Sequence, residues 1–472
     1  MVASRLPESA ALVIALALVT WTLRMLHQTA CNTNEVELNT MLRLCYSDLP
    51  VLWRDGGLGS GGVPYRGASL DQPPLIALWV LLTQRLTFLV APLEPVAPRS
   101  LEGDTTFFVS LNVLLLGGAF LVLVVAHLLL SRRHPHPPTE LTLEGLGRIG
   151  LFTALSVGVF TAGTISWALV PAALVAVALV LWASRRVAVA GVVLGLAASA
   201  AWYPLMLLVA LWILCRRADR LRDWSTFAMT TMATWVVINL PIVLVAPQGW
   251  LLQARTAMAP EVGLGSVWHV LQQATGVTLR VWPLSWLLVA VAVAAVTALC
   301  WWAPRRPRLA QVFALLVLAI TVTAPVYSPQ HVIWIAPLAL LARPVLLDWL
   351  VFSLVEAVYW AAVWGHLQGN LWGGGPFGAY SAAILLRVAV QVWLMARIIA
   401  DIRSPWYDPV RSGHVDDPLG GVLDHTTDRA PDEVLHLQDS LGALGDDPVD
   451  DDALVAGGPA VDDPAPTGEA AR

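Results

Sequence analysis

The chain contains no lysine and carries little charge of either sign. All 28 of its basic residues are arginines, and charged residues occupy only 13% of the 472 positions, against roughly a quarter in soluble domains. Only four cysteines are present, which is too few for a disulfide scaffold. Hydrophobic residues instead make up 57% of the chain, and the mean hydropathy is +0.68. This composition excludes a soluble enzyme and predicts an all-α polytopic membrane protein.

Apolar runs long enough to approach the thickness of a bilayer recur along the first 400 residues. The sequence predicts about twelve transmembrane helices, at residues 8–27, 106–130, 147–163, 165–184, 187–202, 203–215, 224–246, 284–303, 309–325, 331–343, 346–366 and 379–399. Several are shorter than the roughly 20 residues that a perpendicular helix needs. We therefore expect the 147–215 and 309–343 regions to be tilted, broken or partly re-entrant.

The arginines predict which side of the membrane each loop faces, because cytoplasmic loops retain basic residues during insertion. With a cytoplasmic N-terminus and the first apolar run as an anchor helix, every arginine cluster between the spans lies on the cytoplasmic side. These residues are Arg132, Arg133, Arg148, Arg185, Arg186, Arg216, Arg217, Arg220, Arg222, Arg305, Arg306, Arg308, Arg343, Arg397 and Arg403. The arrangement requires 74–92 to lie on the outer interface as an amphipathic helix. If 74–92 crosses, the loops that follow change sides.

The net charge of −5 is unevenly distributed along the chain. Residues 401–472 hold seventeen acids and four arginines, a net charge of −13, so the first 400 residues carry +8. The region from 404 is rich in Asp, Pro and Gly and cannot bury enough apolar surface to offset the entropy of ordering. The sequence thus predicts a membrane domain over 1–403 and an acidic, disordered cytoplasmic tail over 404–472. This distribution argues against nucleic acid as a partner.

Two long extracytoplasmic loops follow from this topology, at 28–105 and 247–283, and the first concentrates polar residues beside the membrane. Its acids include Glu35, Glu37, Asp48, Asp55 and Asp71. A carboxylate at the lipid boundary can act as a general base toward a sugar hydroxyl. Loop carboxylates are far more often simply solvated, so position in the loop alone does not single out any one of these acids.

Several short motifs in this loop and beyond occur in a particular order. They are Cys45-Tyr46-Ser47-Asp48-Leu49-Pro50, Val63-Pro64-Tyr65, Asp71-Gln72-Pro73-Pro74, Ile165-Ser166-Trp167, Trp202-Tyr203-Pro204-Leu205, Asn239-Leu240-Pro241, Gly249-Trp250, Gly265-Ser266-Val267-Trp268 and Ser328-Pro329-Gln330-His331. In this order the chain resembles the actinobacterial family 87 glycosyltransferases over residues 8 to about 400. Those proteins have the GT-C fold and use polyprenyl-phosphate sugars as donors.

The resemblance implies a function for particular residues. By position Asp48 corresponds to the catalytic base of an inverting transfer, with Asp71 as a supporting carboxylate or alternate base. Arg54, Arg66 and Arg255 are candidates to neutralise the departing phosphate. Further candidate substrate contacts are Tyr46, Tyr65, Trp268, Gln330 and His331. The transferred sugar would be a hexose such as mannose and the acceptor a cell-envelope glycan or glycolipid, with no cofactor.

The chain also departs from the family pattern. An acid is common where Ala168 stands, a basic residue is common where Trp202 stands, and the Glu-Tyr-Pro at the end of the first loop is here Asp71-Gln72-Pro73. These differences keep a second hypothesis open: a non-catalytic membrane protein, either a lipid-carrier transporter or an inactive scaffold of an envelope-synthesis complex.

Two further pairs of residues carry structural predictions. Cys31 and Cys45 share the first external loop, where a disulfide can persist. Glu356 and Arg387 lie within the last two apolar runs, where unpaired charges are costly, and consecutive antiparallel helices would let them form an ion pair. No histidine has a companion at metal-ligand spacing, so no metal site is expected.

Overall fold

A computed structural model describes residues 8–29, 31, 40–41, 43–68, 70–90, 101–131, 148–373, 375–411 and 416–428. Within these ranges the regular structure is almost entirely helical, apart from two-residue strands β1 (Val63–Pro64) and β2 (Gly67–Ala68) that pair in parallel. Six described helices are long and apolar enough to cross a membrane. They are α1 (Glu8–Thr29), α4 (Leu101–Ser131), α10 (Leu221–Val245), α13 (Trp282–Trp302), α16 (Leu346–Leu367) and α17 (Ala379–Arg403). The fold is therefore consistent with an all-α membrane protein.

The remaining apolar runs form shorter helices, so twelve full-length spans are not observed. These elements are α5 (Arg148–Ala154), α6 (Val157–Ala162), α7 (Leu169–Ala183), α8 (Val187–Ala200), η2 (Tyr203–Leu205), α9 (Met206–Arg217), α14 (Leu309–Thr323), η3 (Pro329–His331) and α15 (Val332–Ala342). The run at 147–163 is broken because the side chain of Ser156 caps α6, which ends one helix and starts another. This outcome agrees with the expectation of broken helices in both regions.

In helix α3 (Pro74–Val90) the uncharged polar residues face the protein, whereas Arg85 is exposed. Thr83, Gln84 and Thr87 are buried, and the Gln84 amide donates to the carbonyls of Leu58 and Gly62. The exposed side also carries leucines such as Leu82 and Leu89. The helix thus buries its uncharged polar groups against the bundle, while its exposed side is apolar apart from Arg85; whether 74–92 lies on the outer interface stays a prediction.

The C-terminal region differs most from expectation. We call residues 404–411 and 416–428 the C-terminal strap, which includes η4 (Pro405–Tyr407) and η6 (Gly421–Leu423). The carboxylate of Asp408 accepts two hydrogen bonds from Arg308, at 2.7 and 2.9 Å, and both side chains are fully buried. Gln311 donates to the same carboxylate. The prediction of a solvated tail from 404 is therefore wrong for the strap, because Asp408, Asp416 and Asp428 pair with arginines of the helical body. Residues 429–472 lie outside the described residues.

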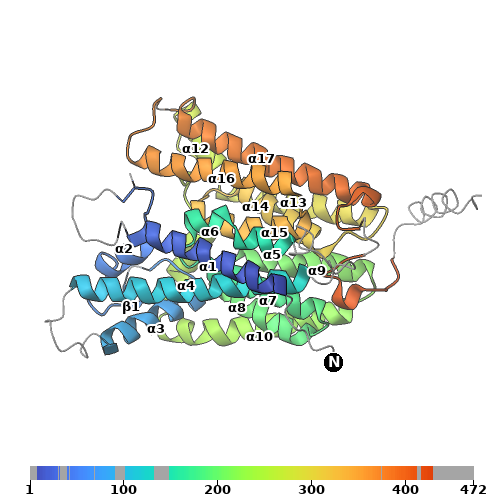
Figure 1. The fold of residues 1–472 in the computed structure, drawn as a ribbon, viewed down its shortest axis with the longest axis horizontal. Coiled ribbons are helices and arrows are strands. Elements are labelled where there is room, and N and C mark those ends of the chain that lie inside the picture. Colours follow the sequence, from blue (N-terminus) through green and yellow to red (C-terminus); the bar gives the residue numbers. More distant parts are fainter. Residues whose placement is uncertain are drawn as a thin grey trace, which may run out of the picture. The chain divides into compact units, whose positions relative to one another are not determined.

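Other strap residues bind arginines from different parts of the chain. Asp428 forms an ion pair with Arg217 at the end of α9 and accepts the backbone N–H of Arg306. Arg306 also donates to the Leu423 carbonyl, and Arg185 donates to the Gly421 carbonyl. Arginines separated by more than 100 positions are thus gathered at one end of the helices. Figure 1 shows α2 and β1 at the opposite end from the strap, which is drawn in red.

Removing the Asp408 carboxylate will destabilise the protein far more than removing an exposed carboxylate. Asp408→Ala leaves a buried guanidinium without its counter-ion, which costs about 3–5 kcal/mol. The control is Asp223→Ala, because Asp223 pairs with Arg220 at 3.9 Å on the surface and such pairs contribute about 1 kcal/mol or less. Thermal unfolding of the purified chain in detergent measures both. Equal midpoints for the two variants would contradict the structural role of the strap.

Candidate functional site

Helix α2 (Asp48–Arg54) presents the first-loop acid that the sequence analysis singled out. The side chain of Ser47 caps the helix by accepting the N–H of Leu49. Leu49 and Trp53 are fully buried, and the Trp53 ring stacks on Phe108 of α4 at 4.6 Å between centroids. Apolar residues on one face therefore fix this short helix to the bundle, although an isolated helix of seven residues would not be stable.

A buried hydrogen-bond network holds the chain just before α2. Arg24 of α1 donates to the Thr164 hydroxyl (2.7 Å) and to the side-chain Oε1 of Gln28 (2.8 Å). The Gln28 amide donates to the Cys45 carbonyl at 2.9 Å, and the Ser47 hydroxyl donates to the Thr164 carbonyl at 2.6 Å. Two segments more than 100 residues apart are thereby joined. Arg24 was not among the residues predicted from the sequence, although an arginine inside the first apolar run was a visible signal.

Asp48 is held next to the Ile165-Ser166-Trp167 motif. Its backbone N–H donates to the Ile165 carbonyl at 2.8 Å. Burial raises the pKa of its half-buried carboxyl to about 6, and a hydrogen bond from the Tyr46 hydroxyl opposes that rise. The Tyr46 ring packs against Trp364 of α16, with centroids 5.0 Å apart. Asp48 is thus a sheltered acid whose carboxylate is formed near neutral pH.

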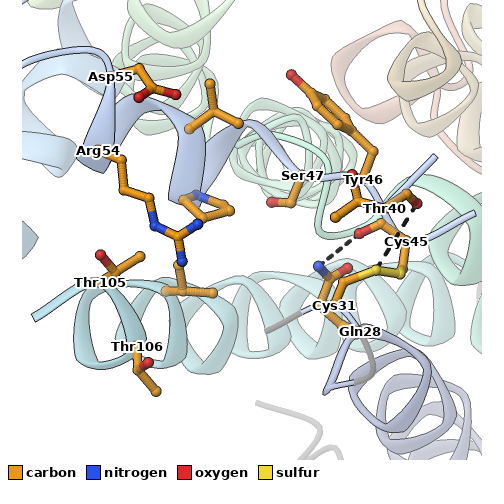
Figure 2. A pocket seen from close by; sticks show the side chains of 13 residues that line it. Gln28, Cys31, Thr40, Cys45, Tyr46, Ser47, Arg54, Asp55, Thr105 and Thr106 are labelled. Carbon is orange, nitrogen blue, oxygen red and sulfur yellow. Dashed lines mark hydrogen bonds between the residues drawn. A yellow bond between two sulfur atoms is a disulfide. The ribbon is translucent and has the colours of Figure 1, made fainter. Parts of the chain in front are cut away.

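A cavity of about 120 Å³ lies beside α2. It is lined by Gln28, Cys31, Thr40, Cys45, Tyr46, Ser47, Pro50, Val51, Arg54, Asp55, Thr105, Thr106 and Val109. Figure 2 shows Arg54 and Asp55 on one side of this space and the Cys31–Cys45 disulfide on the other. Positions 47, 50, 51, 54 and 55 recur with helical spacing and form one face of α2. Asp48 does not line this cavity and lies on the neighbouring face.

The two cysteines of the first loop form a disulfide, as the sequence analysis proposed. Cys31 and Cys45 are fourteen positions apart, with Cα atoms separated by 6.0 Å. The bond lies at the cavity wall and immediately precedes Tyr46. It therefore restrains the segment that carries the hydrogen-bond donor to Asp48.

The other first-loop candidates lie outside the cavity lining. Asp71 is exposed, so it is less suited than Asp48 to act as a sheltered base. Tyr65 adopts a left-handed backbone (φ 65°) and donates from its hydroxyl to the Gln72 carbonyl. Arg66 is exposed and donates to the carbonyl of Val245 at the end of α10. This contact ties the first loop to the end of α10.

The other predicted substrate contacts lie later in the chain, on α11, α12 and η3. Arg255 is exposed on α11 (Pro247–Met258), and Trp268 lies on α12 (Val267–Thr275), where its indole N–H donates to the Thr323 carbonyl. Gln330 is half-buried in η3. The His331 ring stacks on Tyr327 at 5.1 Å and accepts the N–H of Ser328. None of these four residues lines the cavity beside α2.

Glu356 and Arg387 do not form the direct ion pair that the sequence predicted; no ion pair joins them in the described structure. Gln391 donates to Glu356 at 2.9 Å and accepts from Arg387 at 3.3 Å. The Tyr327 hydroxyl donates to Glu356, while the Arg387 guanidinium lies 3.5 Å from the centre of the Tyr327 ring. Arg387 also donates to the Gly265 carbonyl. The two charged groups are therefore linked through Gln391 and Tyr327. The same network contacts the Gly265 motif through Arg387, and Tyr327 directly precedes the Ser328 motif.

The described residues contain no cluster of three or more His, Cys, Asp or Glu side chains suited to a metal ion. Compared with models of protein families and with curated proteins, the chain gives no match. The evidence on function therefore comes from the residues around α2.

The disulfide predicts a simple labelling pattern. Under denaturing, non-reducing conditions a maleimide should label two cysteines, Cys215 and Cys300, which are free in the structure. Cys31→Ser should raise the count to three, because it releases Cys45. Opening a loop of this length should also lower the stability by about 3 kcal/mol. Four labelled cysteines in the unmodified chain would contradict the disulfide.

Proposed function

We propose that this protein is an integral-membrane hexosyltransferase. It transfers a hexose, such as mannose, from a polyprenyl-phosphate donor to a cell-envelope glycan or glycolipid. Asp48 is the general base, and the reaction inverts the anomeric centre. The proposal includes a GT-C-like arrangement of about twelve membrane-crossing segments in the plasma membrane, with both termini cytoplasmic and α2 on the outer side.

The observation that carries this proposal is the environment of Asp48. A carboxylate is a useful base when its pKa lies close to the operating pH, and burial raises the pKa of Asp48 to about 6. The adjacent cavity offers hydroxyls from Ser47, Thr105 and Thr106 and the charged groups of Arg54 and Asp55. This mixture suits a ligand with several hydroxyls and one acidic group.

The proposed reaction is a single displacement. Asp48 takes the proton from an acceptor hydroxyl while that oxygen forms a bond to the anomeric carbon of the donor. The bond between this carbon and the phosphate oxygen breaks, and its electron pair leaves with the polyprenyl phosphate. A guanidinium can stabilise the charge that develops on the departing oxygens. Arg54 is the candidate whose side chain lines the cavity.

The arginine-rich end of the helices supports the proposed orientation. Arg185, Arg217, Arg306 and Arg308 are gathered there by the strap, and basic residues accumulate on the cytoplasmic side. The α2 end is then extracytoplasmic. A disulfide there is compatible with an oxidising compartment.

A non-catalytic role is the second candidate function. Ala168 is 6% exposed within the apolar core, and Trp202 is 37% exposed. Neither supplies the charged group that is common at these positions in family 87 proteins. A lipid-carrier transporter or an inactive scaffold has no need of a base at Asp48, so the two functions differ in their response to its substitution.

Asp48→Asn should lower hexose transfer by about 10²- to 10⁴-fold, the usual contribution of a general base. The assay uses membranes and a radiolabelled polyprenyl-phosphate mannose, with Glu261→Gln as the control. Glu261 is an exposed acid of the second external loop. Equal transfer by Asp48→Asn and the unmodified chain would remove Asp48 from the mechanism, and no transfer by either would favour the non-catalytic role.

The rate of transfer should rise with pH through about 6, because the protonated Asp48 cannot accept a proton and its pKa lies there. The Tyr46 hydroxyl stabilises the carboxylate, so Tyr46→Phe should move this midpoint to higher pH. A kcat/KM profile between about pH 5 and pH 8 reports the pKa of the free enzyme. A midpoint that stays in place in Tyr46→Phe would contradict the hydrogen bond between Tyr46 and Asp48.

A further inference from the structure

A second, larger hollow lies at the end of the helices opposite α2. It is an open groove of about 540 Å³ along the last turns of α13. Ala295, Ala298, Leu299 and Trp302 line it, together with the turn at Ala303 and the side chain of Arg403 at the end of α17. The four α13 positions share one helix face, because they recur at intervals of three or four residues. Two of them are alanines, and their small side chains leave room for the groove.

This face of α13 is directed outward. The membrane-length window of the helix is only 22% buried, and Trp302 is 65% exposed. A membrane helix with an open apolar groove meets lipid chains there. Exposed tryptophans at helix ends are typical of the membrane–water interface, so Trp302 marks the depth at which head groups begin.

Arg403 provides the charge at the mouth of the groove. It is exposed, and within the described ranges its side chain makes no hydrogen bond or ion pair. Neighbouring charges are already engaged: Arg217 pairs with Asp428, and Asp401 pairs with Arg343. An uncompensated guanidinium beside an apolar channel is complementary to a molecule with a hydrocarbon chain and a phosphate.

We infer that the α13 groove, with Arg403 at its mouth, binds an anionic glycerophospholipid. One acyl chain lies along Ala295, Ala298 and Leu299, and the phosphate accepts hydrogen bonds from the Arg403 guanidinium. A zwitterionic lipid carries its own cation next to the phosphate and gains less from the arginine. The inference does not depend on the proposed transferase activity.

The test is native mass spectrometry of the full chain in mild detergent, titrated with phosphatidylglycerol or phosphatidylcholine. The unmodified chain should retain phosphatidylglycerol in preference to phosphatidylcholine. Arg403→Gln should weaken that binding about fivefold, as expected for the loss of one basic residue at a lipid surface. The control is Arg397→Gln, which removes the same charge from an exposed position of α17 outside the groove.

A second pair of variants tests the apolar part of the site. Ala295→Phe fills the groove and should weaken retention of phosphatidylglycerol, whereas Ala294→Phe places the same ring on an adjacent exposed position outside it. Equal retention by Arg403→Gln and Arg397→Gln, or by the two phenylalanine variants, would overturn the inference. Competition by millimolar inorganic phosphate alone would also overturn it, because the site would then recognise a free anion.

Discussion

The hydrogen bond from the Asp48 backbone to the Ile165 carbonyl is the contact on which the candidate site depends. It joins the first loop to the helices that follow α6, and the interaction of Thr164 with Arg24 and Ser47 surrounds it with further hydrogen bonds. Buried polar groups that lack partners are costly. Each hydrogen bond of this network therefore restricts the conformations open to the other members. The position of the Asp48 carboxyl follows from this fixed backbone.

The long helices could be predicted from the sequence because their apolar runs exceed the length needed to span a bilayer. The short ones could not be delimited so well. Ser156 interrupts an apolar run by capping α6, and η3 precedes α15 where Pro329 cannot donate a backbone hydrogen bond. In both places a single serine or proline decides where one helix ends and the next begins. Hydropathy averaged over a window of residues barely changes at these positions.

The C-terminal strap and the candidate site show what composition cannot reveal. From composition alone, an aspartate-rich segment is expected to be solvated. The partner of Asp408 is Arg308, one hundred positions earlier in the chain, so no local pattern reveals the pair. Family resemblance directed attention to Asp48, and the structure gives it a sheltered position. The resemblance ranked Asp48 above Asp71 by position alone; that Asp48 is half-buried and Asp71 exposed depends on packing by distant helices. Arg66 likewise pairs with the end of α10, a contact that no local motif encodes.

The order in which the chain is synthesised gives the strap a consequence for biogenesis. Arg185, Arg217 and Arg308 leave the ribosome before Asp408, Gly421 and Asp428, which later engage them. In the proposed topology, these cations are still unneutralised during insertion and can hold their loops on the cytosolic side. Once the last segment arrives, the same cations become internal cross-links. In that topology, a single set of arginines first orients the nascent polypeptide and afterwards fastens the finished bundle.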